Sequence, residues 1–157
     1  MSRQAEEAYE VHNPGAEGRI IFLCDHASRA IPAELGTLGL PQSEFARHIA
    51  YDIGASDLTC AFAERFEAPA IIARWSRLLV DLNRGADDPT VVMKLSDGRI
   101  IPGNRDLDRA AIAQRIARYH APYHARIAQQ IGAARERGIV PVLISLHSFT
   151  PHSRGTM

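Results

Sequence analysis

The chain has 157 residues, of which 46% are hydrophobic and 23% charged, which is enough to enclose the core of one domain. Its 18 basic and 18 acidic residues cancel, so it has no global positive field to hold nucleic acid or an anionic bilayer. No stretch approaches the roughly 20 apolar residues of a membrane span. The two cysteines, Cys24 and Cys60, form no CxxC pair, which argues against a disulfide scaffold and favours a reducing cytoplasm.

The N-terminal segment differs from the rest of the chain. Residues 1–18 contain few large apolar side chains and end in the turn-forming residues Pro14, Gly15 and Gly18. We therefore expect an N-terminal leader over residues 1–18 and a single domain over residues 19–157.

Four short apolar runs have the composition of strands. Their length and β-branched content favour strands over helices, and the fully apolar runs are typical of strands covered on both faces of a parallel sheet. The runs are RIIFLC (19–24), AIIARW (70–75), LLVDL (78–82) and IVPVLISL (139–146).

The segments between these runs favour helices and one long loop. Residues 42–66 have helical spacing, with Ser43 as a candidate N-cap and Gly54 as the point that divides the segment. Residues 85–105 contain three turn signals and no clear period, so we expect a loop that overhangs a site.

The most regular helical pattern spans residues 107–137, where apolar side chains recur at steps of three and four. Pro122 removes a backbone donor inside it, which predicts a kink or break near His120. Gly138 is placed to end it. Strands that alternate with helices predict an α/β fold with a mixed, largely parallel sheet flanked by helices.

Two of the expected strands end in a histidine, His26 and His147. Ligands bind at the carboxyl ends of parallel strands, so neighbouring strands would bring both imidazoles into one crevice. Two imidazoles and one carboxylate form the open three-ligand site of catalytic zinc. Asp52, inside an apolar stretch, is the candidate carboxylate, and Asp25 competes with it. The alternative is that the two histidines only cap strand ends with hydrogen bonds.

Polar side chains also follow the run LLVDL. Asn83 and Arg84 suit a substrate carboxylate, because a guanidinium and an amide can hold it through several hydrogen bonds. Arg77 is a candidate catalytic residue that binds a developing oxyanion or a second carboxylate. The alternative for Arg84 is an ion pair with a nearby aspartate, such as Asp81, Asp87 or Asp88.

A second pair of histidines, His120 and His124, has the spacing of helical zinc ligands. Pro122 lies between them and disturbs the helix, so we favour roles on a helix face or in a pocket wall over ligation.

Five motifs occur in a fixed order along the chain: CDHASRAIP, HIAYDIGA, SRLLVDLNR, IPGN and LHSFTP. Together they resemble the N-formylglutamate amidohydrolase family from about Arg19 onward. The resemblance implies a phosphorylase/hydrolase-like fold of the zinc carboxypeptidase-like kind. The usual HxxE motif of that superfamily is absent, since Arg29 stands where its glutamate would be, and the acid ligand must come from elsewhere.

The resemblance also assigns roles to individual residues. It implies one zinc ion per chain, held by His26 and His147 with Asp52 as the third ligand. It implies that Asn83 and Arg84 bind the α-carboxylate of the substrate. Substrate contacts from Tyr123, and from Ser148 with Phe149 and Thr150 beside the second histidine, follow in the same way.

The implied reaction is hydrolysis of N-formyl-L-glutamate, a small-molecule N-acyl amino acid, to glutamate and formate. Similar proteins continue beyond this point and carry a later glutamate that resembles the catalytic base, so we expect a domain that is incomplete at its C-terminus. Its last strand would then lack cover, which favours a homo-oligomer. The alternatives are a zinc deacylase for another N-acyl amino acid or peptide, and a catalytically inactive binding or assembly module.

Overall fold

The structure, a computed structural model, describes residues 8–150. The main sheet contains four strands, and a separate hairpin contains two. The strands are β1 (Tyr9–His12), β2 (Ile20–Cys24), β3 (Ala70–Ala73), β4 (Leu95–Ser96), β5 (Arg99–Ile100) and β6 (Val142–Ser145). The α-helices are α2 (Ala55–Arg65), α3 (Pro102–Arg105), α4 (Arg109–Arg115) and α5 (Ala121–Glu136). Shorter helical segments are η1 (Ala33–Leu35), η2 (Gln42–Ala46) and the π-helical turn η3 (Ile116–His120).

The main sheet has the strand order β1-β3-β2-β6. β2 pairs in parallel with both β3 and β6, whereas β1 pairs antiparallel with β3. The mixed, largely parallel sheet predicted from the sequence is therefore confirmed. β1 lies within the segment that we expected to be a leader, so the fold includes residues before the boundary placed at residue 18.

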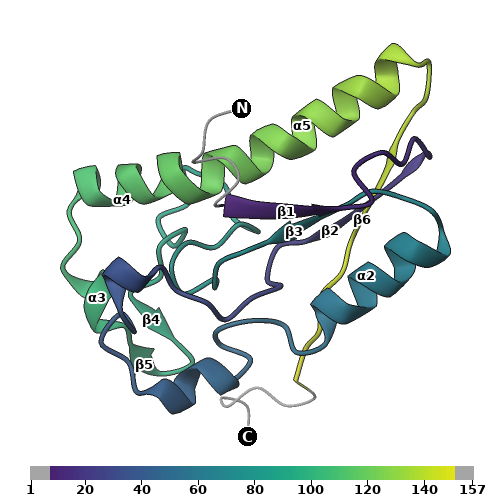
Figure 1. Cartoon of the computed structure of the whole chain (residues 1–157). Helices are drawn as coiled ribbons and strands as arrows, with labels where there is room; N and C mark the ends of the chain where they lie inside the picture. The colour runs from purple at the N-terminus through teal and green to yellow at the C-terminus, as the bar shows by residue number, and fades with distance from the viewer. Residues whose placement is uncertain (1–7, 151–157) are drawn as a thin grey trace, which may run out of the picture.

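Helices cover both faces of this sheet, with α5 across one face and α2 against the other (Figure 1). Alternation along β2 divides its side chains between the two layers. Ile21 and Leu23 pack in the same core as Tyr123 of α5, while Phe22 packs with Ala63 of α2. Each large apolar side chain that is buried in this way contributes roughly 1.5–3 kcal/mol.

The run LLVDL does not form a strand, contrary to the sequence prediction. It follows an irregular, buried path in which Leu78 and Leu79 are 0% exposed. Side chains satisfy its carbonyl groups: the amide of Asn104 donates to Leu78 at 2.8 Å, and Arg115 donates to Leu79 at 3.2 Å. An apolar run predicts that a segment is buried, but it does not predict which secondary structure the segment adopts. Here donors from distant residues satisfy the backbone carbonyl groups, so the segment is buried without pairing in a sheet.

The segment 42–66 is divided at Gly54, as predicted. η2 occupies its start, and α2 begins after Gly54, whose φ of 77° lies in the left-handed region that favours glycine. Ser43 is not the cap, because Pro41 holds the N-cap position of η2 without a side-chain hydrogen bond. Asp52 therefore lies in a turn before α2 instead of within a helix.

The long helical segment is continuous but irregular at the place where Pro122 predicted a disturbance. α4 passes through the wide turn η3 into α5, and Pro122 follows η3 in the first turn of α5, where its missing N–H interrupts the backbone hydrogen-bond ladder. Gly138, with a φ of 75°, ends the helix, and the N–H of Ile139 donates to the carbonyl of Ala134 at 3.0 Å. The predicted C-terminal cap is confirmed.

The edge strand β6 is open, as expected for the last strand. Val142, Leu143 and Ile144 are 37%, 42% and 37% exposed, although they continue the sheet next to the buried β2. Their side chains point alternately to the two faces, so both faces expose apolar surface at this edge. None of the described helices is long and apolar enough to cross a membrane.

Candidate metal centre

The two strands that end in histidine are parallel neighbours. β2 pairs with β6, with Leu23 opposite Ser145, and both strands then end at the same rim of the sheet. The rings of His26 and His147 lie there with their centroids 5.1 Å apart. The structure thus brings together the two imidazoles that were predicted from the sequence to follow strand ends.

A carboxylate completes the cluster. The N–H of Asp52 donates to the carbonyl of His26 at 2.9 Å, which fixes the turn before α2 against the end of β2. Oδ2 of Asp52 then lies 2.8 Å from Nδ1 of His147 and 3.6 Å from Nδ1 of His26. One potential ligand atom from each of the three residues lies within 4.8 Å of the others. The donor set fits a metal ion of the zinc type.

His26 is anchored through the nitrogen that faces away from this cluster. Its Nε2 lies 2.7 Å from Oδ1 of Asp81, and both side chains are buried. Its Nδ1 is buried and makes no hydrogen bond to any described residue. A buried ring nitrogen without a partner is costly, and a metal ion would satisfy it. The imidazole–carboxylate pair is the arrangement that commonly orients metal-ligating histidines.

Asp81 belongs to the site, although its sequence context predicted only an ion pair with Arg84. Burial disfavours its charged form, but hydrogen bonds from His26 and from the N–H of Asn83 outweigh burial and lower the pKa of Asp81. The sequence carried no direct signal for this role, because the segment around Asp81 forms no strand whose alternation would place its side chain beside His26.

His147 is less deeply placed. Burial lowers the pKa of its imidazole, which favours the neutral form that binds metal ions. Its Nε2 lies 3.2 Å from Oγ of Ser145 and 3.5 Å from Oδ2 of Asp25. Asp25, the competing candidate ligand, therefore lies behind the ring of His147 instead of in the three-residue cluster.

Tyr123 does not line the cavity beside the cluster, which corrects the expected substrate contact. The side chain is 0% exposed, and its hydroxyl donates to Oδ1 of Asp25 at 2.5 Å. Burial, together with the neighbouring Asp25, raises the pKa of Tyr123 well above its usual range, so the phenol is a donor at neutral pH.

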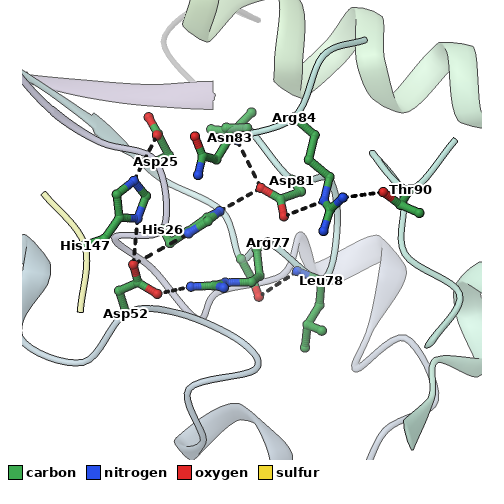
Figure 2. Close-up of polar contacts among 12 residues, drawn as sticks. Asp25, His26, Asp52, Arg77, Leu78, Asp81, Asn83, Arg84, Thr90 and His147 are labelled. Carbon is green, nitrogen blue, oxygen red and sulfur yellow. Dashed lines mark hydrogen bonds and ion pairs between the residues drawn. The ribbon is translucent and has the colours of Figure 1, made fainter. Parts of the chain in front are cut away.

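Arg77 pairs with the other oxygen of Asp52, Oδ1 (Figure 2). Burial lowers the pKa of Arg77, and its Nε is buried without a hydrogen-bond partner among the described residues. The carboxylate of Asp52 thus divides its two oxygens between a guanidinium and the two imidazoles. The part of the Arg77 side chain that is exposed, 21%, leaves further N–H donors of its guanidinium for a bound molecule.

Arg84 forms the ion pairs that were its alternative interpretation. Its Nε donates to Oδ2 of Asp81 at 3.2 Å, and its Nη1 lies 3.6 Å from Oδ2 of Asp88. Its side chain still remains 39% exposed at the cavity. Asn83 is exposed beside it, with its backbone tied to Asp81.

These groups surround a cavity of about 410 Å³. Besides the three clustered residues, its lining includes Arg77, Asp81, Asn83, Arg84, Asp88 and Phe149. Asp88 comes from the loop expected to overhang the site. Ser148 contributes its backbone, whose N–H donates to Oδ2 of Asp52 at 3.3 Å. A larger crevice of about 580 Å³ lies beside residues 28–31, and its described lining contains no histidine, cysteine or carboxylate.

The two histidines of the long helical segment, His120 and His124, contact backbone carbonyl groups and do not belong to the three-residue cluster. Nε2 of His120 lies 2.8 Å from the carbonyl oxygen of Arg84, and Nε2 of His124 lies 3.0 Å from that of Leu82. Burial lowers the pKa of His124, assisted by the neighbouring His120. Together they fix the segment that carries Asn83 and Arg84, in agreement with the preferred interpretation of a helix-face role.

The comparisons with known proteins agree with this α/β architecture, a mixed sheet flanked by helices. The family model for N-formylglutamate amidohydrolase matches residues 18–156, and the chain belongs to that family. A search of curated proteins found no match.

Solved structures similar to the chain include the following two proteins. The gene product Atu2144 from Agrobacterium tumefaciens is 35% identical, with a TM-score of 0.90 over 96% of this chain and 60% of that one. N-formylglutamate amidohydrolase from Ralstonia eutropha JMP134 is 21% identical, with a TM-score of 0.74 over 94% of this chain and 63% of that one, and supports the fold. The chain thus spans less than two thirds of the length of these two proteins.

Proposed function

We propose that the chain binds one Zn²⁺ through His26, Asp52 and His147 and hydrolyses N-formyl-L-glutamate to glutamate and formate. The observation that carries this proposal is the buried Nδ1 of His26, which makes no hydrogen bond to the described residues and lies 3.6 Å from the Asp52 oxygen that also faces Nδ1 of His147. A bound zinc ion supplies Lewis-acid polarisation of the amide carbonyl and lowers the pKa of water toward neutrality.

The residues of the chain account for binding and orientation. N-formylglutamate carries two carboxylates, and the cavity contains two guanidinium groups, those of Arg77 and Arg84. Arg84 with Asn83 binds the α-carboxylate, since a planar guanidinium and an amide offer several donors to one carboxylate. The guanidinium of Arg77, whose side chain is 21% exposed and lines the cavity, binds either the second carboxylate or the oxyanion that develops at the formyl carbon.

Hydrolysis also needs a base that takes a proton from the attacking water and returns one to the leaving amine. Three carboxylates line the cavity in the described part of the chain, and each already pairs with an arginine: Asp52 with Arg77, and Asp81 and Asp88 with Arg84. This pairing supports a second candidate function, a metal-binding module with little or no turnover.

Metal analysis and a formate-release assay on the purified chain test both candidates. Wild-type protein should contain one zinc ion per chain, and His147→Ala should lose it, whereas the matched control His12→Ala should retain it. His12 lies on β1, outside the described lining of the cavity, and its Nε2 is 3.5 Å from the exposed Glu64.

The outcomes separate the candidates. Formate release that requires zinc supports the hydrolase, and a panel of N-acyl amino acids and peptide amides then separates N-formylglutamate from other substrates. Stoichiometric zinc without formate release supports the binding module. Stoichiometric zinc in His147→Ala, with unchanged activity, would remove this residue from the site.

A further inference from the structure

A polar network outside the three-residue cluster connects His147 to the interior of the sheet. Oγ of Ser145 lies 3.2 Å from Nε2 of His147 and 3.2 Å from Oδ2 of Asp25. The other oxygen of Asp25 accepts a hydrogen bond from Tyr123 on α5. Asp25 and Tyr123 are buried, while Ser145 lies at the exposed edge strand.

The donors and acceptors of this network are matched when His147 binds a metal ion through Nδ1, and the path through Ser145, with contacts of 3.2 Å, is shorter than the direct distance of 3.5 Å from His147 to Asp25. An ionised carboxylate only accepts hydrogen bonds, so the hydroxyl of Ser145 donates to Asp25. The lone pairs of Ser145 Oγ then remain to accept from Nε2–H of His147. A neutral imidazole that carries its proton on Nε2 presents the lone pair of Nδ1 toward Asp52.

We infer that Ser145 and Asp25 form a hydroxyl–carboxylate relay that positions His147 for metal binding, with Tyr123 holding Asp25 in place. The inference rests on the proposed zinc site and adds positioning residues to it. None of these residues belongs to the three-residue cluster or to the described lining of its cavity.

The relay compensates for the position of β6 at the edge of the sheet. His26 follows the central strand and is held directly by the buried Asp81. His147 follows a strand whose side chains are largely exposed, so its backbone alone restrains the ring less. A side-chain network that reaches across to Asp25 on the neighbouring strand β2 supplies the missing restraint.

Zinc affinity and the ring proton of His147 test the relay. Ser145→Ala should weaken zinc binding about 10-fold in a chelator competition, the loss expected when an outer partner of a ligating histidine is removed. Ser145→Thr, which keeps the hydroxyl, should restore most of the affinity. Ser96→Ala in the β4–β5 hairpin is the matched control and should bind as wild type does.

Nitrogen-edited NMR of the zinc-loaded protein gives an independent readout. The Nε2–H proton of His147 should be observable in the wild type and in Ser145→Thr. It should be lost to solvent exchange in Ser145→Ala, while circular dichroism stays unchanged.

Zinc binding by the wild type, combined with unchanged affinity and an unchanged Nε2–H signal in Ser145→Ala, would overturn the relay and leave the proposed function intact. A wild-type protein that binds no zinc would overturn both.

Discussion

The strands β2 and β6 perform the same task in contrasting surroundings. Each delivers a histidine to the candidate metal centre from its carboxyl end, but β2 is the buried middle of the sheet and β6 is its exposed edge. The side-chain contacts of the two histidines differ as well. The buried carboxylate of Asp81 contacts His26 directly, whereas Ser145 lies between His147 and the carboxylate of Asp25. Two candidate ligands of one site can therefore be held rigid by different interactions.

The largest expected effect concerns packing around the two strands. Ile21 and Leu143 are paired in register on the α5 side of the sheet but are 1% and 42% exposed. Ile21→Ala should lower the free energy of unfolding by about 3 kcal/mol, because it opens a cavity in the core. Leu143→Ala should lower it by less than about 1 kcal/mol, because much of that side chain already contacts water. Urea denaturation followed by circular dichroism measures both.

Equal losses of unfolding free energy in the two variants would contradict the difference in burial between β2 and β6. They would show that β6 is covered in solution, and the protein concentration dependence of unfolding would then reveal whether a second copy provides the cover.

An intermediate effect is expected from the anchor of the central histidine. Asp81→Asn should weaken zinc binding about 10- to 100-fold, because the amide is a weaker acceptor for His26 and leaves Arg84 without this partner. Chelator competition measures the change, with the exposed Asp57→Asn as control. A smaller loss than that of Ser145→Ala would reverse the order of rigidity assigned to the two strands.

The smallest effect is expected at the open edge itself. Leu143→Lys places a charge where the side chain is already 42% exposed, so the free energy of unfolding should change by less than about 0.5 kcal/mol. Self-association, if the apolar edge drives it, should decrease, because a lysine at a strand edge opposes pairing with another chain. Sedimentation velocity over a concentration series measures this. An increase in association would show that β6 is not the contact surface.

Residues at the ends of strands could be predicted from the sequence, because a buried apolar run that stops at a polar residue marks the rim of a parallel sheet. His26 and His147 were found in this way, and the structure brings them together with Asp52. The mixed sheet and the disturbance near Pro122 also followed from local patterns.

Residues whose role depends on distant partners could not be placed. The segment LLVDL has the composition of a strand, yet its carbonyl groups are satisfied by Asn104 and Arg115 from far along the chain. Tyr123 has the spacing of a core position and the character of a pocket residue, and only its contact with Asp25 decides between them. Asp81 looked like a partner for Arg84, and its second contact with His26 depends on the folded sheet.

The wide turn η3 has a geometric consequence for the whole site. A π-helical turn contains one residue more than an α-helical turn, and each residue advances a helix by about 100°. Removal of one residue from Ile116–His120 would therefore rotate α5 about its axis relative to α4. Tyr123 would swing away from Asp25, and His124 would leave the carbonyl of Leu82. The rotation of α5 about its axis thus determines both the contact of Tyr123 with Asp25 and the contact of His124 with Leu82.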